Sequence, residues 1–201
     1  MSRQPYPWLK PGIFIGALVP LASIVVRANL GALGADPIAK IENELGLAAL
    51  VLLVASLACT PARRLLGWTW PIRIRRELGL FAFFYACLHV AMYVVVDQGI
   101  DVFAIFDDIL KRPFITVGFL AFVLLLPLAL TSTPESIRKL GFKRWQRLHM
   151  LVYIAGVLAV IHFFWRVKID IAQPLTYAWI VAALLMVRVV VGLRARQRSA
   201  P

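Results

Sequence analysis

The chain has 201 residues, a formal net charge of +12 at pH 7, and 61% hydrophobic residues. That apolar share is far above the roughly 45–50% of a soluble domain, so it excludes an ordinary soluble protein and leaves little sequence for a soluble domain. The basic residues lie mainly in short connections between apolar runs. Membrane orientation and contacts with lipid headgroups therefore explain the charge, and we expect no nucleic-acid binding.

Six apolar runs are long enough to cross a bilayer, which takes about 20 residues of helix. They lie at about 11–26, 45–62, 78–96, 113–131, 148–165 and 171–187. We therefore expect an all-α integral membrane protein, a bundle of six transmembrane helices forming a single domain, 1–201. The first run also resembles a secretory signal peptide, but Pro20 and Arg27 interrupt it, so we favour a retained helix.

Lysine and arginine are unevenly divided between the two sets of connections. One set, together with the termini, holds fifteen of them: Arg3, Lys10, Arg63, Arg64, Arg73, Arg75, Arg76, Arg138, Lys139, Lys143, Arg144, Arg147, Arg194, Arg196 and Arg198. The opposite set holds six and carries eight of the ten acidic residues. Because basic connections stay on the cytoplasmic side, we expect both termini to be cytoplasmic and the third and fifth spans to run outward.

The three histidines, His89, His149 and His162, all lie in strongly apolar segments. An ionisable side chain inside a membrane is costly and indicates a functional site. At about 1.5 Å per residue, His89 and His162 both fall in the outer half of the membrane, whereas His149 falls about 20 Å further in. Two imidazoles at equal depth on separate helices suit a bis-histidine heme, so we predict that His89 and His162 are its axial ligands, between the third and fifth spans.

Other interpretations of these residues stay open. A lone membrane histidine can simply donate a hydrogen bond to a carbonyl, while zinc would need a third or fourth ligand, and Asp97 and Asp170 lie at span edges. A covalently attached heme would need CxxCH, which is absent. Cys59 and Cys87 are expected to be small buried hydrophobes. The alternative function is a small histidine-relay transporter or proton-conducting protein, which would favour acidic residues within the spans and internal repeats.

Two segments carry a family resemblance. RRELGL at 75–80 opens the span that contains His89. WQRLH at 145–149 ends in His149, which lies 13 residues before His162. Both are similar to the ferric-reductase-type transmembrane domain. Within it, the chain most resembles the MsrQ (YedZ) family, the heme-binding membrane subunits of bacterial periplasmic methionine sulfoxide reductase systems. The resemblance covers essentially the whole chain, with a heme-binding core at about 45–166.

The resemblance implies heme b and a place in the bacterial inner membrane. It implies electron transfer from the quinone pool, or from a flavin reductase, to a periplasmic molybdopterin-containing subunit that reduces methionine sulfoxide in proteins. FMN is a further implied cofactor. The chain would then be an electron-transfer subunit of an oxidoreductase, without a substrate-reducing domain of its own.

The wider family places two histidines on each helix, for two stacked hemes. Here Arg75 and Arg76 stand where the inner histidine of the third span is expected. We predict that His149 serves the electron-entry side, as a ligand of a second, weakly held heme or as part of a quinone or flavin site. Arg75 and Arg76 are candidate contacts for an anionic flavin or quinone headgroup, although the positive-inside bias alone also explains them.

Overall fold

The computed structural model describes residues 6–167 and 169–198, and these residues are almost entirely helical, with no strand among them. Within the described part, the helices long and apolar enough to cross a membrane are Leu9–Asn29, Pro37–Leu66, Trp70–Asp97, Pro113–Leu130, Phe142–Arg166 and Ala172–Leu193. This confirms the predicted all-α membrane protein with six spans.

Six spans and two short connecting helices make up the fold. The spans are formed by α1 (Leu9–Asn29), α2 (Pro37–Leu66), α3 (Trp70–Ala91) with a π-helical turn (Met92–Asp97), α5 (Pro113–Leu130), α7 (Phe142–His149) followed by α8 (Leu151–Arg166), and α9 (Ala172–Arg198). The connecting helices are α4 (Val102–Lys111) and α6 (Pro134–Leu140). Hydropathy did not predict either of them, because both are too short to span a bilayer.

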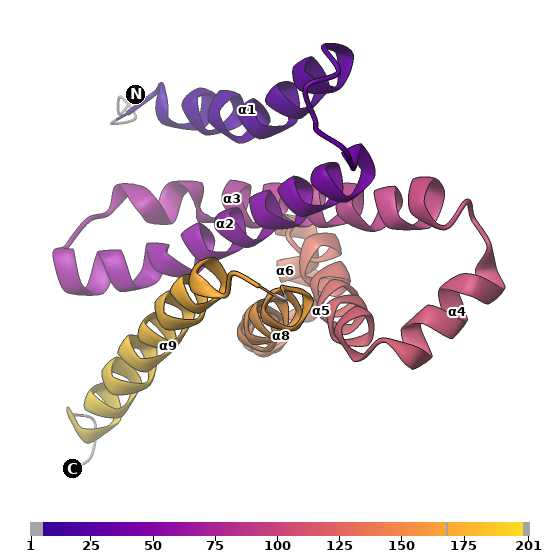
Figure 1. Ribbon diagram of the computed structural model, residues 1–201. Coiled ribbons are helices and arrows are strands. Elements are labelled where there is room, and N and C mark those ends of the chain that lie inside the picture. The colour runs from indigo at the N-terminus through magenta and orange to yellow at the C-terminus, as the bar shows by residue number, and fades with distance from the viewer. Residues whose placement is uncertain (1–5, 168, 199–201) are drawn as a thin grey trace.

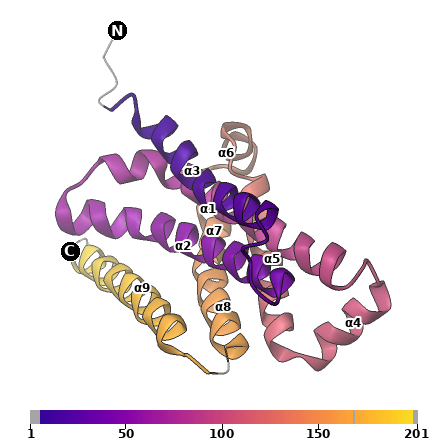
Figure 2. The same ribbon diagram turned by 45° about the horizontal axis from the view of Figure 1, so that its top comes forward.

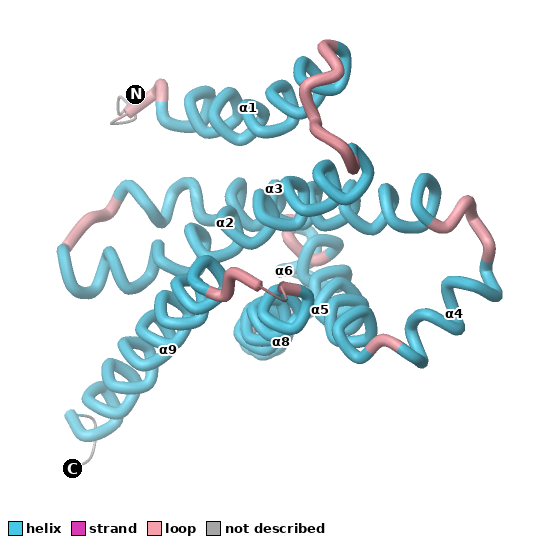
Figure 3. The backbone as a smooth tube through the Cα atoms, in the orientation of Figure 1, coloured by secondary structure: helices cyan, strands magenta, loops and turns pink. Residues whose placement is uncertain are grey.

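The core of the bundle consists of two helix pairs, α2 with α3 and α5 with α8, and α3 contacts α5 while α2 contacts α8. α2 and α3 are the most extensively packed pair, and α5 packs along α8. Figure 1 shows α2 and α3 running together beneath α1, and Figure 2 shows α5, α8 and α9 descending side by side. In Figure 3, α4 and its flanking loops form an arm that leads from the end of α3 to the start of α5.

Local capping explains where α2 begins and ends. The Asp36 side chain accepts a hydrogen bond from the Ala39 N–H at 3.0 Å, and Pro37 occupies the first turn. At the other end, Gly67 adopts a φ of 71°, a left-handed conformation that favours glycine. α2 therefore extends well beyond the apolar run at 45–62 in both directions.

α3 also begins earlier than hydropathy predicted. It starts at Trp70, with Pro71 in its first turn, whereas the apolar run starts at 78. Arg75 and Arg76 therefore lie on the helix and not in a connection, which corrects the sequence-based assignment. The connection that remains between α2 and α3 is only 67–69.

α1 is attached to its neighbours by polar contacts at several levels. Lys10 forms an ion pair with Glu77 of α3 at 3.1 Å, and Arg27 forms an ion pair with Glu44 of α2. Between them, the buried Tyr85 of α3 forms hydrogen bonds with the α1 backbone. α1 is thus fixed against the α2–α3 pair by more than apolar packing.

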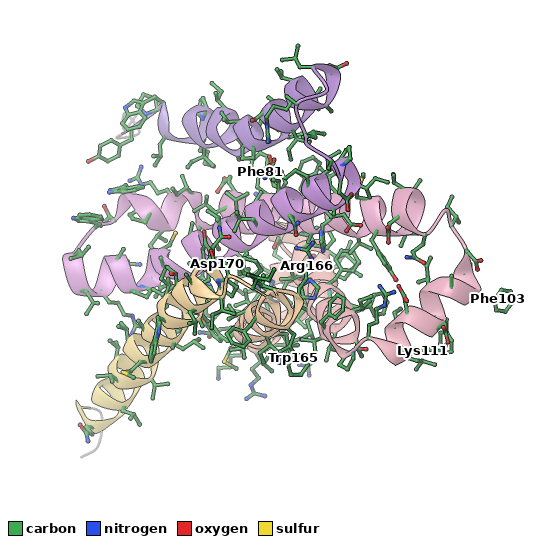
Figure 4. The ribbon with its side chains drawn as sticks, viewed as in Figure 1. Phe81, Phe103, Lys111, Trp165, Arg166 and Asp170 are labelled. Carbon is green, nitrogen blue, oxygen red and sulfur yellow. The ribbon has the colours of Figure 1, made fainter. Side chains whose placement is uncertain are left out.

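Large apolar side chains cover the outside of the bundle. Ile15 of α1 and Trp179 and Met186 of α9 are exposed, and Phe103 of α4 is 89% exposed and points away from the bundle in Figure 4. A soluble monomer rarely exposes so much apolar surface, whereas lipid covers it at no cost. The exposed surface agrees with the six apolar helices in indicating a membrane protein.

Candidate functional site

α3 and α8 bring His89 and His162 together at one cavity. Their ring centroids are 6.1 Å apart and their ring planes are inclined by 73°. The cavity has a volume of about 360 Å³, within the range of pockets that hold small ligands and cofactors, and its walls come from α2, α3, α4, α5 and α8. The structure therefore brings together the two histidines that the sequence paired by depth.

Each of these imidazoles is held by a backbone carbonyl of a neighbouring helix. His89 Nδ1 lies 3.0 Å from the Glu42 carbonyl oxygen, and His162 Nδ1 lies 2.7 Å from that of Phe114. A carbonyl oxygen only accepts, so each Nδ1 carries the proton and donates it. Nε2 keeps its lone pair on both rings, and metal-binding histidines are usually held by this kind of hydrogen bond.

The spacing of the two rings suits one metal atom between them. A bond from a metal to imidazole nitrogen is about 2.0 Å long, so two imidazoles whose Nε2 atoms share one metal have ring centres somewhat more than about 4 Å apart. The observed distance is 6.1 Å. Among the described residues, no three His, Cys, Asp or Glu side chains gather to hold a metal ion. A heme, whose ring supplies the remaining donors, fits this pair better than zinc.

The cavity is apolar along most of its wall and charged at one end, which is the outer end under the orientation expected from charge. Leu50 and Phe122 contribute to the apolar wall, whereas Glu42, Arg112 and Arg166 lie at the ends of their helices. Heme is a flat apolar ring with two carboxylates at one edge, so this distribution fits its chemistry. Figure 4 shows Arg166 near the end of α8, below α2.

Sequence reasoning did not select Arg112 or Arg166 as site residues. A signal was present, because the orientation expected from charge puts both cations at outer ends of spans, against the positive-inside bias. Arg112 Nε lies 3.2 Å from Asp108 of α4. Both side chains line the same cavity as the two histidines and can supply positive charge to the carboxylates of a bound group.

Comparison with known proteins places this architecture in a family. Residues 44–160 match the family described as "Ferric reductase like transmembrane component". Three similar proteins are each named as the protein-methionine-sulfoxide reductase heme-binding subunit MsrQ. That of Deinococcus radiodurans is 48% identical over 190 residues, 94% of each chain. That of Rhodospirillum rubrum is 51% identical over 185 residues, 92% of this chain and 89% of the relative. That of Xanthomonas axonopodis pv. citri is 50% identical over 197 residues, 95% and 90% respectively.

The chain belongs to the MsrQ family of ferric reductase-like membrane proteins. This confirms the resemblance seen in the sequence. The assignment of individual histidines as ligands stays a prediction, which the geometry of His89 and His162 supports.

The third histidine of this MsrQ-family chain lies apart from the outer cavity, where α7 ends. α7 ends at His149 and α8 begins at Leu151, and Met150 between them keeps right-handed helical dihedrals (φ −69°, ψ −20°), so His149 and His162 lie on one span, Phe142–Arg166. His149 Nε2 lies 3.1 Å from Thr131 Oγ1, and its ring centroid lies 4.1 Å from that of Trp145. Because the Thr131 hydroxyl donates to the Pro127 carbonyl at 2.6 Å, it must accept from His149 Nε2–H.

Arg75 and Arg76 reach different neighbours. Arg75 Nη1 donates to Thr60 Oγ1 on α2 at 3.3 Å, whereas Arg76 Nε donates to the Ser132 carbonyl after α5 at 2.7 Å. Arg75 is close enough to act electrostatically on His149. The structure therefore gathers these three residues on one side of the MsrQ-type bundle, away from the outer cavity, without joining both arginines in one contact.

Proposed function

We propose that this MsrQ-family chain is a heme b electron-transfer subunit, with His89 and His162 as the two axial ligands of an outer heme. The observation that carries the proposal is the meeting of two imidazoles from α3 and α8 at one cavity, each with Nδ1–H bound to a carbonyl. The names of the relatives, which call those proteins heme-binding subunits, support it.

The residues of the cavity suit a cofactor that only passes electrons. When bound, heme b supplies reversible one-electron chemistry at its iron. His89 and His162 would hold the iron between them and would leave it no open position, which would disfavour oxygen binding. The apolar walls keep water from the site, and Arg112 and Arg166 offer positive charge to the heme carboxylates.

The acceptor in this proposal is a periplasmic molybdopterin-containing subunit that reduces methionine sulfoxide to methionine and water. That reaction consumes two electrons and two protons, so the chain must deliver electrons singly, twice in each turnover. Two observations support this partner: the names of the relatives, and the position of the cavity at the outer ends of the spans under the orientation expected from charge.

The donor side lies at the opposite, cytoplasmic end. We propose that the chain sits in the bacterial inner membrane with both termini cytoplasmic, and that electrons arrive from the quinone pool or a flavin reductase. His149, Arg75 and Arg76 serve this entry side, where a second heme, a quinone or FMN would bind. Their cationic surroundings suit an anionic headgroup.

Replacement of each outer histidine tests the ligand assignment. The purified chain should be red, with the spectrum of a low-spin, six-coordinate b-type heme. His89→Ala and His162→Ala should each abolish that signal or convert it to high spin, because the loss of one axial ligand opens a coordination position. If both variants kept the parental spectrum, the assignment would be wrong, and a colourless parent protein would favour the histidine-relay alternative.

A further inference from the structure

We propose that Gly46 and Gly118 are positioning residues for the outer heme. Each glycine, together with the carbonyl one helical turn before it, forms a seat for one axial imidazole and thereby fixes the ring, its tautomer and the reduction potential. The proposal rests on the proposed function, because it takes His89 and His162 as the ligands.

The first seat lies on α2 and receives His89. The ring donates Nδ1–H to the Glu42 carbonyl at 3.0 Å. A Cβ added to Gly46 would lie 3.3 Å from both Nδ1 and Cε1 of the His89 ring. That clearance is tight, so any side chain at this position would press on the imidazole.

The second seat lies on α5 and receives His162. The ring donates Nδ1–H to the Phe114 carbonyl at 2.7 Å. A Cβ added to Gly118 would lie 2.6 Å from His162 Nδ1 and 2.8 Å from Cε1. A Cβ atom does not approach a ring atom to which it is not bonded so closely, so the ring would have to leave the seat.

Both seats consist of a carbonyl and of a glycine four residues later on the same helix, and helix geometry explains this spacing. In each, the accepting carbonyl belongs to residue i and the glycine is residue i+4, at 42 and 46 and again at 114 and 118. In an α-helix the carbonyl of residue i already accepts the N–H of residue i+4, so its second lone pair opens beside the side chain of that residue. Glycine is the residue that leaves this lone pair accessible to an imidazole.

Glycines in membrane helices also serve simple helix packing, and this chain offers a comparison. Gly156 of α8 would place a Cβ 3.3 Å from Leu57 Cδ1, an aliphatic contact. The clearance equals that of Gly46, but no ligand ring is involved. Gly156 is therefore a matched control for the effect of a tight added methyl group.

A seated imidazole also affects the iron that it binds. Hydrogen bonding from Nδ1–H to an acceptor raises the basicity of the ring, which stabilises the oxidised metal. Displacing the ring weakens that hydrogen bond, so the reduction potential should rise. A tenfold change in the equilibrium between oxidised and reduced forms corresponds to about 59 mV for a one-electron couple.

The test uses the full-length chain, purified with heme, and three variants: Gly46→Ala, Gly118→Ala and Gly156→Ala. Heme content, the low-spin electron paramagnetic resonance signal and the midpoint potential of the outer heme are measured. We expect Gly118→Ala to lose the outer heme or its low-spin signal. Gly46→Ala should keep heme but shift the low-spin signal. Its midpoint potential should rise by the amount that corresponds to a tenfold change in the equilibrium between oxidised and reduced heme. Gly156→Ala should match the parent in all three measurements.

Parental potentials and resonance signals in both Gly46→Ala and Gly118→Ala would overturn the proposal. Equal changes in all three variants would also overturn it, because packing alone would then explain the glycines. If Gly118→Ala does not fold, Gly46→Ala decides the question. Failure of the proposed function would look different, since His89→Ala and His162→Ala would then keep the parental spectrum.

Discussion

Replacing Tyr85 with phenylalanine tests how α1 is attached to the bundle. The Tyr85 side chain is 0% exposed, and its hydroxyl donates to the Ala17 carbonyl at 2.6 Å and accepts from the Leu21 N–H at 3.1 Å. In an uninterrupted helix the Leu21 N–H would bond to the Ala17 carbonyl directly. The hydroxyl therefore bridges a donor and an acceptor of the backbone ladder of α1, beside Pro20, which interrupts that ladder.

Tyr85→Phe removes both hydrogen bonds while keeping the ring. A side-chain hydrogen bond between membrane helices is worth about 0.6 kcal/mol on average. A buried polar group left unsatisfied costs about 1–3 kcal/mol, so we expect the free energy of unfolding to fall by about 1–3 kcal/mol. The carbonyl that holds His89 belongs to Glu42 of α2, so the heme spectrum should not change.

Thermal unfolding of the detergent-solubilised chain measures the loss of unfolding free energy. Each kcal/mol lost should lower the melting temperature by about 2–4 °C. Tyr177→Phe is the matched control. Within the described residues the Tyr177 hydroxyl makes no hydrogen bond, and its ring contacts Phe163 with centroids 6.3 Å apart. Unchanged stability of Tyr85→Phe, or an equal loss in both variants, would refute the bridging role of the hydroxyl in α1.

Two further predictions concern orientation and the entry side. Reporter fusions after Ile72 and Gly141 should report the cytoplasm, and fusions near Gly34 and Asp101 the periplasm, because lysine and arginine set the orientation; a periplasmic signal at Ile72 would reverse the direction of electron flow. His149→Ala should leave the spectrum of the outer heme intact while slowing its reduction by the physiological donor. Loss of the outer heme in this variant would instead make His149 one of the outer pair.

Hydropathy and helix geometry were sufficient to predict the six spans and the common level of His89 and His162. Both follow from one-dimensional quantities: the length of an apolar run against the bilayer thickness, and the fixed rise per residue of a helix. Two histidines at equal depth on spans that run the same way must lie at one level. The closeness of the two rings, 6.1 Å between centroids, adds only that α3 and α8 face each other there.

The seats of these histidines could not be predicted in the same way. His89 and His162 bond to carbonyls 47 and 48 residues away, on helices whose rotation about their own axes no hydropathy value specifies. Gly46 and Gly118 stand in apolar runs where glycine commonly serves close packing, so their contacts with imidazole needed the fold.

The two ends of the molecule hold imidazole in opposite tautomers, and this difference bears on the entry side. At the outer cavity, carbonyl acceptors hold the proton of His89 and His162 on Nδ1 and leave Nε2, the outermost nitrogen of the ring, available to iron. At the inner end the proton of the Thr131 hydroxyl goes to Pro127, so His149 donates from Nε2 and keeps its lone pair on Nδ1, next to its own backbone. Ligation through Nε2 of His149 would therefore first require breaking the hydrogen bond to Thr131. Under the proposed function, that added cost predicts that a cofactor bound at His149 would be held more weakly than a heme bound by His89 and His162.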